Sequence, residues 1–270
     1  MNAKLILMLV GSTTVYAQWI AEFPHGIDAR AEAVQAGLDV QESPDLLPHQ
    51  VLVRGSLAGL HARGARVYPA SHELLAGIPV RACAGAILAG GATPAYSATV
   101  GSWGARRITL GYVVRTMPGE MAPEAVLADI RAAMQAWSRV VQVDFVESTE
   151  PTADHTIAIW WTSGDHGDSY PFEASGQIAH TFFPPPNPEP IAGDMHLNRD
   201  ESWGTLDVYS VVLHELGHAL GLAHSTDPVA VMYPFYRHFE SLASTDIAAA
   251  RLLYDARKFY QMPVYEGEIQ

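Results

Sequence analysis

The stretch HELGHALGLAH at residues 214–224 is the feature that decides how this chain folds and what it can do. Residues four apart on a helix share a face, so His214 and His218 can offer both imidazoles to one metal ion. Gly221 tolerates a positive φ, so the chain can turn sharply there and bring in His224 as a third ligand. Three protein ligands leave one position of a tetrahedral zinc ion open, as catalysis requires. Glu215 is then placed to act on a water at that position.

The complete motif is far more specific than two histidines on a helix. With the frequencies of His, Glu and Gly in this chain, it would arise by chance in roughly one chain in ten thousand. The alternative is an ordinary amphipathic helix that carries surface histidines. Further along, the sequence VMYP at residues 231–234 places Met232 in a turn that ends at a proline. Met232 alone could simply fill the core, but the motif and this turn together are typical of metzincins.

A second group of possible metal ligands precedes this motif. It contains His166, Asp168, His180 and His196. Each residue alone would more often be a surface residue. Together, three histidines and one aspartate can form a closed tetrahedral site, which is structural because no position remains for water or substrate.

Composition and charge exclude several classes of protein. The chain has 270 residues, of which 49% are hydrophobic, so it is neither disordered nor collagen-like. It carries 16 Lys and Arg against 29 Asp and Glu, a formal charge of −13. We therefore expect no nucleic-acid partner. No segment after residue 17 is apolar for about 18 residues, so we expect no membrane span. We also expect a monomer.

The order of the elements indicates an α/β or α+β domain in the second part of the chain. A strand at residues 107–114 precedes a helix that begins at Pro123, and strands at 141–146 and 156–161 follow. Two further helices are predicted near residues 206–220 and 245–256. At the other end of the chain, residues 1–17 combine Lys4, a short apolar run and small residues before a cleavage point. This pattern predicts a signal peptide and a secreted protein.

From Trp103 to about Tyr254 the chain resembles the matrixins, the matrix-metalloproteinase family within the metzincins. The resemblance is carried by five segments in order: HGDSYPF (166–172), IAHTF (178–182), GDMHLNRDESW (193–203), HELGHALGLAHS (214–225) and DPVAVMYP (227–234). It implies an α+β catalytic domain with a mixed, mostly parallel twisted sheet, an antiparallel edge strand and three helices. A small helical propeptide would precede it. The wording of the last segment is more similar to plant and bacterial members than to animal ones.

With this resemblance the chain divides into four parts. Residues 1–17 form the signal peptide and residues 18–100 the propeptide, which ends in a flexible linker that begins at Ala84. Residues 101–257 form the catalytic domain and residues 258–270 a tail.

The resemblance also implies roles for further residues. The second histidine group would hold a structural zinc. The residues that would hold calcium are Glu173, Asp194, Asn198 and Glu201. Here PFEA replaces the usual PFDG, and Asn198 stands where the family usually has aspartate, so fewer carboxylates are available to calcium. Ser210 and Tyr236 would lie near the pocket for the residue after the cut, and Ala179 would lie on the strand that borders the cleft.

Cys83 is the single cysteine of the chain. In matrixin propeptides a cysteine thiolate takes the fourth zinc position and blocks the enzyme, and thiolate is a strong zinc ligand. Here Arg81 is separated from Cys83 by Ala82, whereas the family has arginine directly before the cysteine. The alternative is an inert buried thiol.

The sequence therefore predicts a secreted zinc endopeptidase that acts on extended polypeptides, with Glu215 as the general base for a zinc-activated water. Its predicted cofactors are a catalytic Zn²⁺, a second structural Zn²⁺ and Ca²⁺, and Cys83 is its predicted latency thiol. Two alternatives stay open. One is a secreted metal-binding relative that has lost catalysis, and the other is a zinc amidase that acts on cell-wall material.

Overall fold

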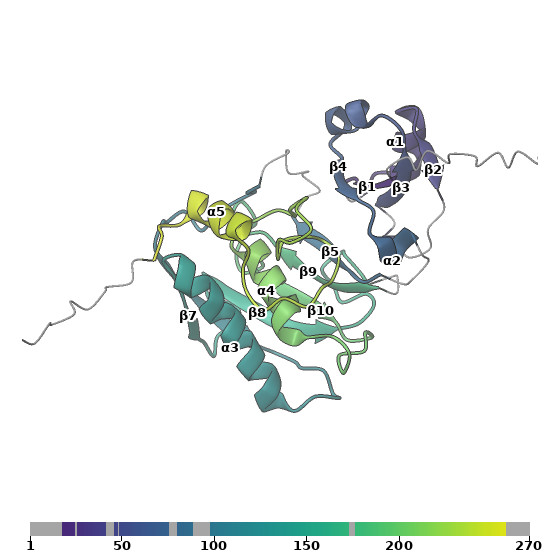
Figure 1. The fold of residues 1–270 in the computed structure, drawn as a ribbon. Helices are drawn as coiled ribbons and strands as arrows, with labels where there is room; N and C mark the ends of the chain where they lie inside the picture. Colours follow the sequence, from purple (N-terminus) through teal and green to yellow (C-terminus); the bar gives the residue numbers. More distant parts are fainter. Residues whose placement is uncertain are drawn as a thin grey trace, which may run out of the picture.

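The computed structural model describes residues 18–24, 26–41, 46–47, 49–75, 80–88, 98–172 and 176–257. The predicted signal peptide, most of the predicted linker, Glu173 and the tail after residue 257 lie outside these residues. The described chain forms two units, a small N-terminal one and a larger one (Figure 1). None of the helices in the described residues is long and apolar enough to cross a membrane.

The larger unit is built on a six-stranded sheet with the order β5-β9-β10-β8-β6-β7. Its strands are β5 (Ala82–Ile87), β6 (Ile108–Val114), β7 (Val143–Glu147), β8 (Thr156–Thr162), β9 (Gln177–Phe182) and β10 (Met195–Asn198). Its helices are α3 (Pro123–Val140), α4 (Val208–Ala219) and α5 (Ser244–Leu253). Strands β7, β6, β8 and β10 run parallel, and β9 is antiparallel to β10. This confirms the α+β fold with an antiparallel strand and three helices.

The helices α3 and α4 pack against each other and against the sheet (Figure 1). Pro123 lies in the first turn of α3, where a missing N–H costs nothing. The buried face of α3 consists of Val126, Ile130, Ala133, Met134 and Trp137. The Trp137 indole donates to the Leu213 carbonyl at 2.9 Å. This bond joins α3 to the helix that carries the zinc motif.

The N-terminal unit is a sheet, and the prediction of a helical propeptide was wrong. Its elements are β1 (Gln18–Glu22), α1 (Ala29–Gln35), β2 (Asp39–Gln41), β3 (Gln50–Arg54), two 3₁₀ turns (Leu57–Gly59 and His61–Arg63), β4 (Arg66–Pro69) and α2 (His72–Leu75). The four strands pair antiparallel in the order β2-β3-β1-β4. Residues 27–40 have the spacing typical of a helix, and α1 does form at Ala29–Gln35, but the last of them enter β2, which pairs with β3.

The flexible linker predicted from Ala84 onward was also wrong for residues 84–87. They belong to β5, which runs parallel to β9 on the outer edge of the sheet. Cys83 pairs with Ala179 across this edge, and Ala82 bridges to Phe235 on the other side. Small residues such as Ala and Gly carry little strand preference of their own, so the partner strand decides their conformation.

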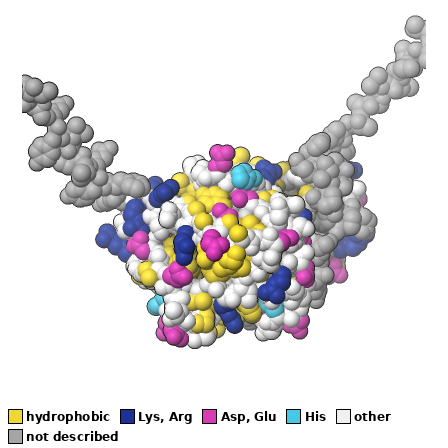
Figure 2. Space-filling view, turned by 90° about the horizontal axis from the view of Figure 1, so that it is seen from below, with side chains coloured by type: hydrophobic (Ala, Val, Ile, Leu, Met, Phe, Trp, Pro, Cys, Tyr) yellow, Lys and Arg dark blue, Asp and Glu magenta, His cyan; other side chains and the backbone are white. Residues whose placement is uncertain are grey.

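A shared apolar cluster joins the two units. It buries Ile20, Leu52 and Tyr68 of the N-terminal sheet together with Tyr233 and Phe235 of the larger unit. The Tyr233 hydroxyl also donates to the Pro69 carbonyl at 3.1 Å. On the face seen in Figure 2, acidic and basic side chains are interspersed around hydrophobic ones, so the excess of negative charge does not form a patch of one sign there.

Candidate active site

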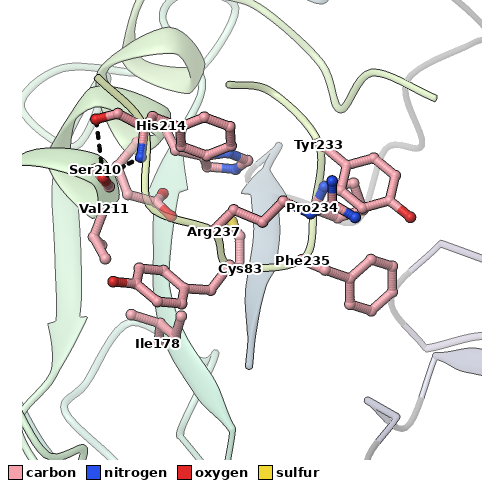
Figure 3. A pocket seen from close by; sticks show the side chains of 12 residues that line it. Cys83, Ile178, Ser210, Val211, His214, Tyr233, Pro234, Phe235 and Arg237 are labelled. Atoms are coloured by element: carbon pink, nitrogen blue, oxygen red, sulfur yellow. Dashed lines mark hydrogen bonds between the residues drawn. The ribbon is translucent and has the colours of Figure 1, made fainter. Parts of the chain in front are cut away.

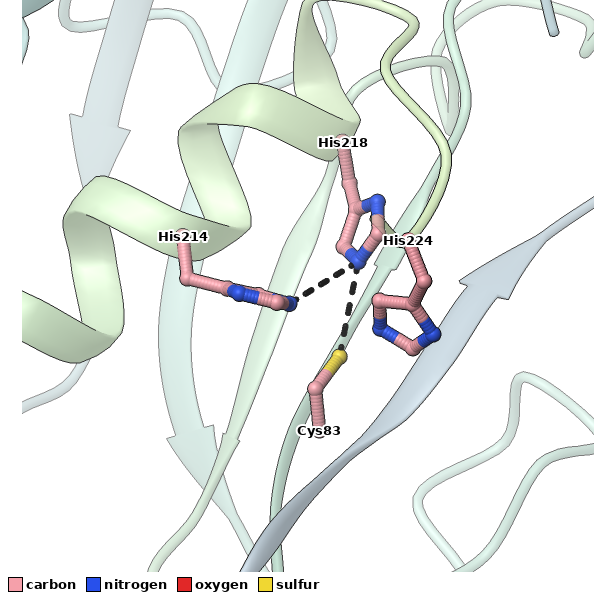
Figure 4. A group of neighbouring side chains, drawn as sticks. All are labelled: Cys83, His214, His218 and His224. Carbon is pink, nitrogen blue, oxygen red and sulfur yellow. Dashed lines mark hydrogen bonds between the residues drawn. The ribbon is translucent and has the colours of Figure 1, made fainter. Parts of the chain in front are cut away.

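The structure brings His214, His218 and His224 together with Cys83. One ligand atom from each lies within 4.8 Å of the others. His214 and His218 lie on α4, His224 follows the end of this helix, and Cys83 reaches in from β5 (Figure 4). All four residues are buried.

Gly221 makes this arrangement possible, as the sequence predicted. Its φ is +102°, and a Cβ atom there would collide with the carbonyl oxygen of Gly101. Because an L side chain is disfavoured in this conformation and has no space, only glycine fits. The chain can therefore leave α4 and return with His224 beside the other two histidines.

The hydrogen bonds of the three imidazoles fit a shared cation. His214 Nδ1 lies 2.6 Å from the Val231 carbonyl, and His218 Nδ1 lies 2.7 Å from the Leu222 carbonyl. A carbonyl only accepts, so both Nδ1 atoms carry the proton and both Nε2 atoms present lone pairs. These two Nε2 atoms lie 3.1 Å apart, and the buried His224 Nε2 has no hydrogen-bond partner among the described residues. Lone pairs in such contact repel unless a cation lies between them.

Burial favours the neutral, ligating form of these imidazoles. It lowers the pKa of His214 to about 3 and holds the pKa of His218 well below its ordinary value. The ligand nitrogens therefore stay unprotonated at neutral pH. Metal binding needs this form, since a protonated imidazole has no lone pair to give.

Cys83 and Glu215 complete the site. The Cys83 Sγ atom lies 3.6 Å from His218 Nε2. Burial and the neighbouring Glu215 raise the pKa of Cys83 well above its ordinary value, so without a cation the sulfur is a thiol. Burial also raises the pKa of Glu215 to about 7, although hydrogen bonds from Thr181 and Cys83 act against this rise. A carboxyl group with this pKa can both take up and release a proton near neutral pH.

The second predicted group is also brought together. His166 Nε2, His180 Nε2 and His196 Nδ1 lie 2.7–2.8 Å from the same carboxylate oxygen of Asp168. His166 Nδ1 lies 2.8 Å from the Gly164 carbonyl and must carry the proton, so its Nε2 lone pair faces the carboxylate. Two acceptors in contact again fit a shared cation. The group is enclosed by Phe172, whose ring lies 5.2 Å from that of His166.

The predicted calcium residues do not form such a group. The two possible metal groups among the described residues contain none of them. Both polar atoms of the Asn198 amide are engaged, with the Gln177 carbonyl and the Asp200 N–H. Glu201 pairs with Arg81 at 3.0 Å and accepts from the Gly176 N–H. Glu173 lies outside the described residues.

Asp194 belongs to neither metal group among the described residues, and its environment predicts an unusual pH dependence of stability. Burial raises the pKa of this carboxyl to about 7, although the Ala158 N–H donates to it at 2.8 Å. The native chain therefore holds a proton at a pH where the unfolded chain has lost it. This contribution to stability is complete below about pH 4 and is lost as the pH rises through 7.

In calcium-free buffer we therefore expect the full chain to gain about 1–3 kcal/mol of unfolding free energy over an Asp194→Asn variant between pH 8 and pH 5. Denaturant titrations of both proteins at the two pH values measure this difference. A constant difference would contradict the assignment. Added calcium is expected to remove the pH dependence if it binds the ionised carboxylate.

A pocket opens beside His214 and Glu215 (Figure 3). Its lining consists of Cys83, Ile178, Ser210, Val211, His214, Glu215, Tyr233, Pro234, Phe235, Tyr236, Arg237 and Phe239. Ser210 and Tyr236 are among these lining residues, whereas Ala179, on β9, is not. The Ser210 hydroxyl accepts from the Phe239 N–H at 2.8 Å, and Tyr236 OH accepts from the Asp207 N–H. Both bonds hold the loop after Pro234 to the start of α4.

Several residues that support the site were missed. The Thr181 hydroxyl donates to Glu215 at 2.6 Å, and Glu22 of the N-terminal sheet lies 3.3 Å from His224 Nδ1. Asp246 accepts from the backbone N–H groups of Val231 and Met232, and so holds the turn that carries Met232. Gly217 leaves no space for a Cβ, because Met232 Sδ lies directly against it. Gly217 stands in the HELGH motif and Thr181 in the segment IAHTF, whereas the sequence carried no signal for Glu22 and Asp246.

The matrixin family model matches residues 102–255, more than half of the chain. The chain therefore belongs to the matrixin family. The match spans α3, α4 and α5 and both histidine groups, and it leaves out the N-terminal sheet, β5 and Cys83.

Curated relatives match the same part of the chain. Matrix metalloproteinase-20 of Homo sapiens is 40% identical over 164 residues, which cover 57% of this chain and 33% of the relative. Macrophage metalloelastase of Oryctolagus cuniculus is 38% identical over 166 residues, 58% of this chain and 34% of the relative. Karilysin of Tannerella forsythia is 37% identical over 136 residues, 48% of this chain and 28% of the relative. The chain thus matches about a third of the length of these relatives.

Proposed function

We propose that this chain is a zinc endopeptidase made as a secreted zymogen. The observation that carries the proposal is the pairing of His214 and His218, whose Nδ1 atoms bond to carbonyls while their Nε2 atoms face each other at 3.1 Å. The unpartnered Nε2 of His224 completes the set of three ligands. Membership of the matrixin family supports the choice of zinc and of peptide substrates.

In the proposed mechanism, His214, His218 and His224 would hold a zinc ion, which would supply polarisation of the scissile carbonyl and a water whose pKa is lowered towards about 7. Glu215 takes the proton from the attacking water and passes it to the leaving amine. Its pKa of about 7 suits both steps. Thr181 donates to Glu215 Oε2 and so holds the carboxylate in place. A protein that only binds metal would need neither a carboxyl group with a pKa near 7 nor a hydrogen bond that holds it in place. These two features of Glu215 therefore argue against a relative that has lost catalysis.

We propose that Cys83 and β5 keep the enzyme latent. The Cys83 sulfur lies with the three histidine nitrogens, where it would be the fourth zinc ligand. Strand β5 pairs with β9 along the edge where an extended substrate would add a strand. Arg81 anchors the same segment through its ion pair with Glu201. Activation would then require β5 to leave the cleft.

The proposed metals are a catalytic zinc, a structural zinc on Asp168 and its three histidines, and calcium. Calcium binding by Glu201 would compete with its ion pair to Arg81, so we expect calcium to bind more tightly after the propeptide leaves. Residues 1–17 would direct export of the chain, which we expect to act as a monomer.

The pocket predicts a preference for a medium or large apolar side chain after the cut. Its wall includes Ile178, Val211 and Phe239. Arg237 also lines the pocket, but its guanidinium donates to the Pro228 carbonyl at 2.8 Å and lies over the Tyr233 ring. Profiling of the processed enzyme on a peptide library measures this preference. A strong preference for a charged residue at that position would contradict it.

Two substrates separate the proposal from its competitor, a cell-wall amidase. The processed chain is incubated with casein and with peptidoglycan, with and without a peptide hydroxamate that binds zinc. We expect casein cleavage that the hydroxamate blocks, and no release of peptides from peptidoglycan. Cleavage of peptidoglycan alone would favour the amidase, and inactivity on both substrates despite bound zinc would favour a relative that has lost catalysis.

A further inference from the structure

The third histidine of the site is held by the N-terminal unit. Glu22 ends β1, and its Oε1 atom lies 3.3 Å from His224 Nδ1. The two residues are 202 positions apart in the sequence. Both side chains are buried, and the part of the chain that the structure describes offers no hydrogen-bond partner to His224 Nε2 on the other side of the ring. The propeptide therefore contacts the site at a second point besides Cys83.

This contact determines which nitrogen of His224 can bind a metal. A carboxylate only accepts, so the proton of the imidazole lies on Nδ1 and the Nε2 lone pair faces the other ligand atoms. A carboxylate behind a ligating histidine fixes its tautomer and its orientation and makes it more basic. His214 and His218 receive the corresponding support from backbone carbonyls of the larger unit. Among the described residues, His224 is the one of the three whose Nδ1 contacts the N-terminal sheet.

Glu22 is itself held in place by its own unit. The Gln50 amide donates to Oε2 at 2.9 Å, and the Tyr68 hydroxyl donates to Oε1 at 3.3 Å. The Tyr68 ring also meets the His224 ring edge to face, with centroids 6.4 Å apart. The N-terminal unit therefore holds both the Glu22 carboxylate and the ring of His224 in place.

We propose that the N-terminal sheet is a metal-retention element: through Glu22 it orients His224, so that the latent chain holds its catalytic zinc more tightly. The inference rests on the proposed function, because it takes zinc as the ion and the latent chain as the form that holds it. It adds a role to the propeptide beyond blocking the cleft. Loss of the propeptide would then expose the zinc as well as free the cleft.

The test measures zinc release from the full chain, without using its activity. All proteins carry Glu215→Ala so that they do not cut themselves. A chromogenic chelator in excess takes up the zinc, and each of the two proposed zinc sites releases its ion in its own kinetic phase. The phase whose rate changes in a Cys83→Ser protein is assigned to the catalytic site. Glu22→Gln removes the carboxylate charge at constant size. Glu32→Gln is the control, because the Glu32 carboxylate pairs with Arg63 inside the same unit at 2.6 Å.

We expect zinc in the phase assigned to the catalytic site to leave the Glu22→Gln protein roughly tenfold faster than its parent. The other phase and the Glu32→Gln protein are expected to match the parent. Release from the Glu22→Gln protein at the parent rate would overturn the inference. If Glu22→Gln does not fold, Tyr68→Phe decides, since it removes one donor to Glu22 and keeps the ring. Faster release from Tyr68→Phe would support the inference, and an unchanged rate would overturn it.

A second measurement separates this inference from the proposed latency. Cobalt replaces zinc in the parent, and a thiolate-to-cobalt absorption band reports whether Cys83 binds the metal. If the band is absent, the proposed latency fails. If the band is present and Glu22→Gln releases zinc at the parent rate, only the role of Glu22 fails.

Discussion

Replacement of Glu215 by alanine is expected to lower kcat/KM of the processed enzyme on a peptide substrate by roughly 10²- to 10⁴-fold. Glu215 lies between the histidines on α4 and is almost fully buried, and its pKa of about 7 lets it exchange a proton during each turnover. Alanine removes this proton carrier and leaves His214, His218 and His224 unchanged. Steady-state rates on a quenched fluorescent peptide measure the effect.

The zinc content of the variant is the control for this experiment. Because Glu215 is not a ligand, we expect the alanine variant and its parent to bind zinc equally. Glu215→Gln keeps the size of the side chain and its ability to form hydrogen bonds but lacks the basic carboxylate oxygen. We expect it to be as inactive as the alanine variant. A processed alanine variant that retains full activity with zinc bound would contradict the role of Glu215.

Replacement of Cys83 by serine is expected to shorten the latent period of the full chain by at least tenfold. The sulfur is the only thiol of the chain and lies 3.6 Å from His218 Nε2. A neutral hydroxyl is a much weaker zinc ligand than a thiolate, so water would compete for the open position. Strand β5 would still cover the cleft through its pairing with β9, so we expect faster self-activation and not immediate full activity.

The time course of peptide hydrolysis after zinc is added to the metal-free chain measures this effect. Ala86→Ser is the matched control, because Ala86 lies on the same strand and pairs with Thr181. It is expected to keep the latent period of the parent. If Cys83→Ser also keeps that period, the cysteine is an inert buried thiol and β5 alone accounts for latency.

The fold of the larger unit could be predicted because its signals are local or carried by long motifs. The buried residues of α3 recur at helical spacing. At Gly221 the chain makes a turn that only glycine can adopt. The histidine groups could be predicted because metal ligands must be of a few residue types. The prediction of three helices and an antiparallel strand was confirmed by the structure.

The N-terminal unit could not be predicted in the same way. Residues 27–40 satisfy a helical pattern, and α1 forms within them, but the sheet depends on the pairing of β1 with β3 and β4, which lie far away in the sequence. Strand β5 consists largely of Ala and Gly, whose conformation is set by the neighbouring β9. Glu22 meets His224 only because two separate units pack together, and no sequence spacing encodes such a contact.

The predicted calcium residues show what a motif leaves undecided. Glu201 stands in a segment shared with the family, but in this structure Arg81 takes one of its oxygens. The Asn198 amide bonds to the backbone, and an oxygen of Asp194 accepts from the Ala158 N–H. The sequence could name the residues, but it could not show that Arg81, 120 positions away, pairs with one of them.

The most direct test of the account combines zinc content and casein cleavage in one sample of the processed chain. Zinc is removed from the sample with a chelator and then returned in measured amounts. We expect cleavage to stop when the zinc is removed and to return in proportion to the zinc bound by the site of His214, His218 and His224, with no recovery in a His218→Ala variant. Cleavage that persists without zinc, or a processed chain that binds zinc fully at this site and does not cut casein, would contradict the account.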